Sequence, residues 1–140
     1  AQFQRMEELV LAKRHLLKRY RQVFSDVPDI ALNQEPPDGR NGAWCSALIF
    51  GKSYNFKKED VIDKLARKGF QGRPFFYPLS SMPAYGNRAS TMRFENPVAY
   101  DVSERGICLP AAFKVSDVEL MEYCNGIRSV LGLEPRECFE

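Results

Sequence analysis

The amino-acid sequence predicts an α/β or α+β domain in which a small sheet of about three strands is covered by helices. Apolar residues recur at helical spacing along residues 1–25, short apolar runs occur at 43–50 and 106–109, and further helical patterns lie between and after these runs. The 140 residues are 44% hydrophobic and 27% charged, which fits one globular domain of common size.

The first expected element is an amphipathic helix over residues 1 to about 25. Phe3, Met6, Val10 and Leu17 follow the spacing of one helix face. The opposite face is rich in Arg and Lys, which can attract an anionic partner, although mixed charge on a solvated face is the commoner meaning. The pattern starts without a capping residue or an acidic first turn, so we expect this helix to lead in from a preceding domain.

The middle of the chain is expected to alternate between strands and helices. Asn33–Gly42 is a polar, turn-rich loop, and Ala43–Phe50 is predicted to form a largely buried strand. Phe56–Lys68 is a predicted helix that ends at Gly69. Gly72–Tyr77 is predicted to form a second strand, which runs into a proline-rich loop.

The last third of the chain adds a third strand and two helices. Glu95–Arg105 is a predicted helix, and Gly106–Leu109 is a short strand. Pro97 favours the first turn of that helix. Ser116 and Glu119 form a capping-box pattern at the start of the final helix. The expected apolar face of the final helix consists of Val118, Met121, Ile127, Val130 and Leu131.

The most informative segment is Gln71–Tyr85, with the sequence QGRPFFYPLSSMPAY. Its three prolines fix φ and remove backbone donors, so we expect Gly72, Tyr77 and Met82 to be non-helical. A stiff loop that carries Arg73 and several aromatic side chains is typical of a binding site. An ordered loop after a buried strand end is the structural alternative.

Composition argues against several classes of function. The chain has 20 basic and 18 acidic residues, so we expect no nucleic-acid partner. We expect no membrane span and no signal peptide. Cys45, Cys108, Cys124 and Cys138 form no C-x-x-C pair and His15 is the single histidine, so we expect no metal site. The cysteines are interpreted as thiols in a reducing, cytoplasmic compartment.

The residues by themselves indicate no catalytic group. Gly51–Ser53 resembles the end of a phosphate-binding loop, but Ser46 stands where that loop requires a glycine. The single histidine lies on the basic face of the first helix, and no Ser-His-Asp or Cys-His arrangement can be identified.

Several segments of this sequence match a known pattern in combination. They are RPFFYPLSSMPAYG at 73–86, NPVAYDVSERGICLP at 96–110 and VSDVELMEYCNGIRSVLG at 115–132. Together they resemble the C-terminal domain of the DegT/DnrJ/EryC1/StrS aminotransferases, and most closely the perosamine synthase branch. Residues 1–24 resemble the helix that follows the large domain of these enzymes.

The resemblance implies that residues 1–140 are the small C-terminal domain of a fold-type I enzyme. The full-length protein would be a pyridoxal phosphate-dependent aminotransferase, a homodimer with its active site at the subunit interface. It would move an amino group from an amino acid, with glutamate as the expected donor, to a keto-sugar nucleotide. The Schiff-base lysine of the family belongs to the large domain, so we expect this chain alone to be inactive and to bind no cofactor.

The resemblance also implies a set of substrate-binding residues on the proline-rich loop, namely Arg73, Tyr77, Ser80 and Tyr85. Arg73 matches the Arg-Pro position of the family, and a guanidinium can bind phosphate or carboxylate through two hydrogen bonds. Ser80 stands where the family commonly has histidine, so an imidazole is lost and a hydroxyl remains. Arg73 could instead tie the strand end to a core carboxylate.

A second hypothesis is a stand-alone binding or interaction domain derived from the same fold. In that case, the apolar side of the first helix would dock a partner. The coding region upstream distinguishes the two hypotheses, because only the first requires a lysine-bearing domain. Neither hypothesis specifies the sugar, the nucleotide or the pathway.

Overall fold

The computed structural model describes residues 2–85, 89–112, 115–137 and 139. It contains a four-stranded antiparallel sheet in the order β1-β2-β4-β3, together with helices, so the predicted fold class is confirmed. The strands are β1 (Ile30–Leu32), β2 (Ala47–Phe50), β3 (Arg73–Pro74) and β4 (Gly106–Cys108). The α-helices are α1 (Met6–Val23), α2 (Lys58–Arg67), α3 (Ala89–Glu95), α4 (Pro97–Arg105) and α5 (Asp117–Val130).

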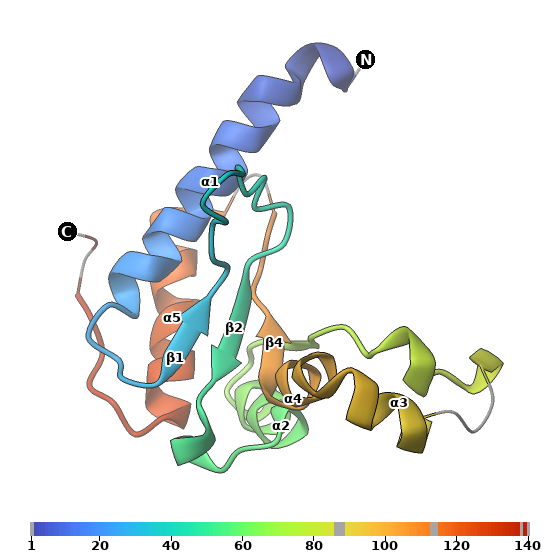
Figure 1. The fold of residues 1–140 in the computed structure, drawn as a ribbon. Coiled ribbons are helices and arrows are strands. Elements are labelled where there is room, and N and C mark those ends of the chain that lie inside the picture. Colours follow the sequence, from blue (N-terminus) through green and yellow to red (C-terminus); the bar gives the residue numbers. More distant parts are fainter. Residues whose placement is uncertain (1, 86–88, 113–114, 138, 140) are drawn as a thin grey trace.

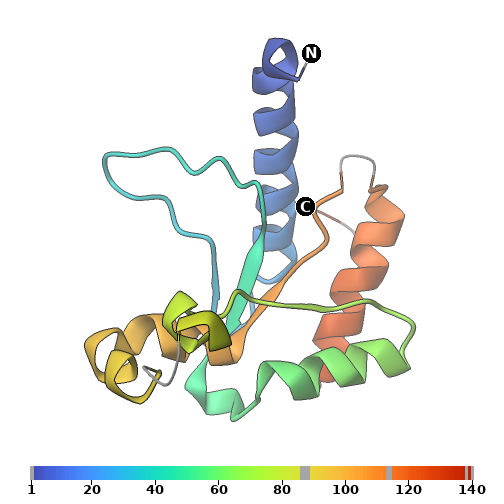
Figure 2. The ribbon, with the colours of Figure 1, turned by 90° about the vertical axis from the view of Figure 1, so that its right-hand side faces the viewer.

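The sheet separates two groups of helices. Helices α1, α2 and α5 lie on one face, and α3 and α4 lie on the other face towards one end (Figures 1 and 2). The long connection between β1 and β2 extends on the same side as α3 and α4 (Figure 2). The second face of the sheet is therefore only partly covered by helices.

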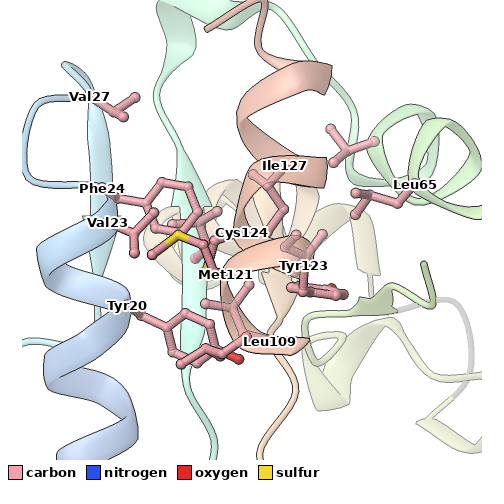
Figure 3. Close-up of a cluster of buried hydrophobic side chains, with 14 of the residues drawn as sticks. Tyr20, Val23, Phe24, Val27, Leu65, Leu109, Met121, Tyr123, Cys124 and Ile127 are labelled. Carbon is pink, nitrogen blue, oxygen red and sulfur yellow. The ribbon is translucent and has the colours of Figure 1, made fainter. Parts of the chain in front are cut away.

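The core lies between the sheet and the first group of helices. Leu48, Phe50 and Ile107 alternate along β2 and β4 towards this side and are fully buried. Side chains of α1 and α5 meet them, and Figure 3 shows Tyr20, Val23 and Phe24 facing Cys124 and Ile127. Burial of these apolar side chains is the main contribution to the stability of the domain.

Helix α1 is amphipathic as predicted, but only its C-terminal half enters the core. Leu16, Leu17, Tyr20 and Val23 are buried. Phe3 remains 83% exposed, and the N-terminal half of α1 projects beyond the sheet (Figure 1). Within the described residues, no helix is both long and apolar enough to cross a lipid bilayer.

Strand β1 was not predicted, and the predicted strand Ala43–Phe50 is shorter than expected. The hydrogen-bonded pairing of β1 with β2 stops at Leu32 and Leu48. Beyond this point, the Asn33 side chain forms the hydrogen bonds to the backbone of the second segment. The Asn33 Nδ2 donates to Cys45 O at 2.9 Å, and Ala47 N donates to Asn33 Oδ1 at 2.7 Å. Ala43 has a φ of 50°, outside the extended region.

The other predicted elements need smaller corrections. The strand expected over Gly72–Tyr77 is reduced to β3, an edge strand in which Pro74 is tolerated. Glu95 belongs to α3, and α4 starts at Pro97, as the proline preference for a first turn predicts.

Helix α5 begins with the predicted capping box. The Ser116 hydroxyl accepts from Glu119 N, and the Glu119 carboxylate accepts from Ser116 N. Val118 was placed wrongly on the apolar face, since it is 68% exposed in the first turn. The side of α5 that meets the core is formed by Leu120, Met121, Tyr123, Cys124 and Ile127.

Gly106 joins α4 directly to β4 where there is no space for a side chain. A Cβ atom at this position would lie 2.8 Å from Ile49 Cδ1, 2.8 Å from Phe75 Cβ and 2.9 Å from Val102 O. We therefore expect Gly106→Ala to lower the free energy of unfolding by roughly 1–3 kcal/mol, as overpacking does elsewhere. Urea denaturation measures this change. Gly42→Ala is the control because a Cβ there has no neighbour within 4 Å, and equal losses in both variants would contradict the steric explanation.

Asp26 ties the end of α1 to α5 and to the C-terminal segment. The Arg128 guanidinium donates two hydrogen bonds to its carboxylate at 2.8 and 2.9 Å, and Arg136 approaches to 3.1 Å. These contacts, with Arg128 the larger cause, hold the pKa of Asp26 well below its usual range. Because the folded-state pKa is depressed, the stabilisation is present above the unfolded pKa of about 3.9 and is lost as pH falls through the folded-state value.

Asp26→Asn is therefore expected to lower stability at pH 7 and to have a progressively smaller effect below about pH 4. Thermal unfolding of both proteins between pH 2 and pH 7 measures the difference. Asp38→Asn is a matched control, because Asp38 is exposed and has no ion pair with any residue that the structure describes. A constant difference between wild type and Asp26→Asn across this pH range would contradict the role assigned to the carboxylate.

Candidate functional site

The proline-rich loop leaves β3 and crosses the end of the sheet that α4 covers. Phe75 N donates to Gly106 O at 2.9 Å, which ties the loop to β4. Two short 3-10 turns, Leu79–Ser81 and Pro83–Tyr85, follow. Gly72, Tyr77 and Met82 lie outside helices, as predicted. Tyr77 and Met82 directly precede a proline, whereas Arg73 stands between Gly72 and Pro74. The loop is ordered by backbone contacts at its base and by proline along its length.

The structure places the four residues expected to bind substrate at separate positions along this loop. Arg73 lies on β3 opposite Cys108, is exposed, and makes no side-chain hydrogen bond or ion pair within the described part of the chain. The Tyr77 ring is 51% exposed, and Tyr85 is 53% exposed in the second 3-10 turn. The Ser80 hydroxyl is 2.9 Å from the Tyr100 hydroxyl on α4, where either group can donate.

Two hollows lie on either side of Phe76. The first, which we call the aromatic–arginine pocket, has a volume of about 460 Å³ and is lined by Trp44, Cys45, Arg73, Phe76, Cys108 and Leu109, among others. The second, the loop–helix pocket, has a volume of about 630 Å³ and lies between Phe75–Pro78 and the start of α4. Arg73 lines the first pocket and Tyr77 lines the second, whereas Ser80 and Tyr85 line neither.

Trp44 is a site feature that the sequence prediction missed. It was assigned to a buried strand, but the strand starts at Ala47 and the indole is 71% exposed. Its ring lies 5.9 Å from the Phe76 ring, centroid to centroid, with the planes tilted by 31°. The turn chemistry of Asn33 and the positive φ of Ala43 place it there. The available signal was Asn33, the first residue of the polar loop that precedes the predicted strand.

Lys58 is a second residue that the sequence did not single out. It stands at the start of α2 and is 98% buried, with 2% of its surface exposed. Its Nζ donates to Phe75 O at 3.3 Å and to Ser103 Oγ at 3.5 Å, and lies 3.6 Å from the Tyr77 ring centroid. Burial lowers the pKa of this amine. No carboxylate in the described part of the chain forms an ion pair with it.

These contacts give Lys58 a definite role in the geometry of the loop. The amine holds the carbonyl of Phe75 and the face of Tyr77, two groups on the segment that separates the pockets. A cation on an aromatic face in a desolvated position contributes about 2 kcal/mol. Lys58 therefore orients the proline-rich loop from the protein interior. Its amine is already engaged with the loop and is not available to a ligand in either pocket.

The cysteine side chains that the structure describes are mostly buried. Cys45, Cys108 and Cys124 are free, and Cys138 lies outside the described residues. Burial raises the pKa of Cys108 to about 12 and that of Cys124 to about 12, so both stay protonated at neutral pH. His15 is exposed on α1, and the described residues contain no group of three metal-ligating side chains.

The charged side chains near the two pockets differ in how accessible they are. Lys58 is the one buried lysine among the described residues, and Tyr77 and Ser103 cover its amine. Among the described residues that line the aromatic–arginine pocket, Arg73 is the one cation, and none of them begins a helix. This arrangement can accommodate a planar or anionic ligand.

Comparison with known proteins relates this arrangement to one enzyme family. The pattern of the DegT/DnrJ/EryC1/StrS aminotransferase family matches residues 1–128. A GDP-perosamine synthase from Vibrio cholerae is 27% identical over 129 residues, which cover 92% of this chain and 34% of the relative. The chain thus spans about a third of the length of the curated relatives it matches.

Solved structures show the same fold. The aminotransferase TlmJ from Streptoalloteichus hindustanus superposes with a TM-score of 0.75 at 23% identity, covering 94% of this chain and 34% of TlmJ. DesI in the presence of its TDP-sugar product gives a TM-score of 0.74 at 17% identity, covering 91% of this chain and 32% of DesI. In both cases the matched part is a minor portion of the larger protein.

Proposed function

This chain belongs to the DegT/DnrJ/EryC1/StrS aminotransferase family, and from that premise we propose that it is the small C-terminal domain of a pyridoxal phosphate-dependent sugar aminotransferase. The family match over residues 1–128, together with coverage of about a third of each relative, is the observation that carries the proposal. Residues 1–140 would form one domain, and residues 1–25 would connect it to a large cofactor-binding domain.

The proposed reaction is transfer of an amino group from an amino acid, with glutamate as the expected donor, to a keto-sugar nucleotide. Pyridoxal phosphate, when bound by the large domain, would supply the electron sink and carry the amino group between the two substrates. Because the Schiff-base lysine of the family belongs to the large domain, the part of this chain in catalysis would be binding and positioning.

Arg73, Tyr77, Ser80 and Tyr85 are proposed to line the substrate site. The Arg73 guanidinium supports this, because it has no ion pair within the described part of the chain and can donate two hydrogen bonds to a phosphate or carboxylate without breaking an existing contact. Tyr77 is held by Lys58, and the Ser80 hydroxyl is already engaged with Tyr100, so Ser80 would act by fixing the loop. The loop would exclude water from one side of the reacting sugar.

A second copy of the complete enzyme is the proposed partner, as a homodimer with the site at the interface. The 3-10 turn Phe3–Arg5 and the N-terminal half of α1 support an additional contact at the dimer interface, since Phe3, Met6 and Leu11 are exposed. The same surface favours the second candidate function, a stand-alone interaction domain that docks a partner through α1. The two functions differ in whether a lysine-bearing domain is encoded with this chain.

The proposal predicts that the complete gene product binds pyridoxal phosphate covalently and that residues 1–140 alone do not. Titration of each protein with the cofactor, followed by its visible absorbance and by intact mass after borohydride reduction, measures this difference. With the complete protein, glutamate should convert the bound cofactor to its aminated form, and a keto-sugar nucleotide should convert it back. Stoichiometric attachment to a single lysine of residues 1–140 alone would overturn the domain assignment.

A further inference from the structure

Trp44 and Phe76 form an exposed aromatic platform at the aromatic–arginine pocket. The two side chains are 71% and 55% exposed, although large aromatic side chains are usually well buried. They come from segments 32 residues apart in sequence, yet their ring centroids are 5.9 Å apart and their planes are tilted by 31°. Such a pair presents flat apolar surface to any planar ring that enters the pocket.

The platform is held in place by contacts that do not involve the rings. Asn41 Oδ1 accepts from Ala43 N at 2.8 Å, and Arg14 donates to Asn41 O at 2.5 Å. On the other side of Trp44, Asn33 holds Cys45 O at 2.9 Å. The residues next to Trp44 are therefore tied to α1 and to Asn33, the residue after β1, so the backbone that carries the exposed indole is held before any ligand binds. Preorganisation of this kind reduces the entropic cost of binding.

The charge at this pocket favours an anion. The Arg73 guanidinium lines it and has no ion pair within the described part of the chain. No carboxylate is among the described residues that line it. The floor includes the Cys108 thiol, which burial keeps protonated and uncharged at neutral pH. An anionic group next to the platform would meet one cation and no opposing charge.

We propose that the aromatic–arginine pocket binds the nucleoside diphosphate end of the substrate. The nucleobase stacks on the Trp44–Phe76 platform, and Arg73 pairs with a phosphate. This inference rests on the proposed function, which requires a sugar nucleotide, and assigns the half of that substrate that does not react. The pocket volume of about 460 Å³ lies within the range usual for sites of small organic ligands. Stacking on aromatic side chains tolerates different bases, so the platform accepts purines and pyrimidines.

The test compares ligands with and without a base on the complete enzyme. Isothermal titration calorimetry with GDP and with inorganic pyrophosphate gives two dissociation constants for wild type, Trp44→Leu and Arg73→Ala. Trp44→Leu should weaken GDP binding by roughly 5- to 100-fold, because base stacking is lost, and should raise the ratio of the GDP to the pyrophosphate dissociation constant. Arg73→Ala should weaken both ligands, because both present phosphate oxygens.

Phe94→Leu is the matched control, since Phe94 is 88% exposed on α3 and lines neither pocket. It should leave GDP affinity within twofold of wild type. A Trp44→Leu enzyme with wild-type GDP affinity would overturn the proposal. So would a Trp44→Leu enzyme that dissociates into subunits or loses affinity for both ligands equally, because Trp44 would then be a protein contact. Failure of the wild-type enzyme to exchange amino groups with glutamate would instead overturn the proposed function.

Discussion

Arg73→Ala is expected to lower the catalytic efficiency of the complete enzyme for its sugar nucleotide by about 30-fold or more. Loss of a desolvated, charge-assisted contact typically costs on the order of 2–5 kcal/mol, which corresponds to that range. The structure favours a ligand-binding role, because Arg73 is exposed on the edge strand and has no carboxylate partner in the described part of the chain. The half-reaction with glutamate should be less affected. Single-turnover measurement of each half-reaction separates the two effects.

The stability of the same variant provides the control. An exposed side chain without partners contributes little to folding, so the midpoint of thermal unfolding should change little in Arg73→Ala. Arg73→Lys keeps the positive charge but cannot form the bidentate hydrogen bond. We therefore expect a catalytic efficiency between those of wild type and Arg73→Ala. Equal losses in both half-reactions, together with a clearly lower unfolding temperature, would show that Arg73 is structural and that the site assignment is wrong.

Arg128→Met is expected to destabilise the domain by about 3 kcal/mol, or roughly 10 °C in the unfolding midpoint. Only 5% of the Arg128 side chain is exposed. Besides Asp26, its guanidinium donates to Val23 O at 3.0 Å and to Glu134 O at 2.6 Å. Methionine fills similar volume but leaves these carbonyls without a donor, which costs free energy in a buried position. Chemical denaturation of residues 1–140 measures the loss.

Arg136→Met separates this network from a simple ion pair. Arg136 also contacts Asp26, at 3.1 Å, but its side chain is 25% exposed. Exposed or partly exposed pairs contribute about 0–1 kcal/mol, so this variant should remain close to wild type. Similar losses for Arg128→Met and Arg136→Met would mean that Asp26 charge neutralisation, and not the buried carbonyl contacts, provides the stability.

The parts of the fold that the sequence predicted are those defined by local interactions. The capping box of Ser116 and Glu119 involves residues three apart, and it starts α5 where the sequence indicated. The prolines of the loop restrict their own neighbours, so the extended residues before them were also predictable. Helix α4 begins at Pro97 for the same reason.

The missed features depend on residues that are distant in sequence. Strand β1 has three residues and follows Asp29, which has a φ of 55°, so only its pairing with β2 defines it. Trp44 was assigned to a buried strand because an apolar run does not reveal that Asn33 interrupts the ladder. Lys58 has no pattern that separates it from other helix lysines, and its burial depends on Phe75, Tyr77 and Ser103. The roles of Arg73, Tyr77, Ser80 and Tyr85 stay predictions.

The strand order also has a consequence for how the domain is made. Strand β4 is the last strand in sequence, yet it lies between β2 and β3 and pairs with both. During synthesis, β2 and β3 therefore emerge without their common neighbour and expose unsatisfied backbone edges until residues 106–108 leave the ribosome. Pairing across such sequence separations is slow compared with helix formation. The nascent chain is therefore expected to be most prone to aggregation before β4 is available to pair with both neighbours.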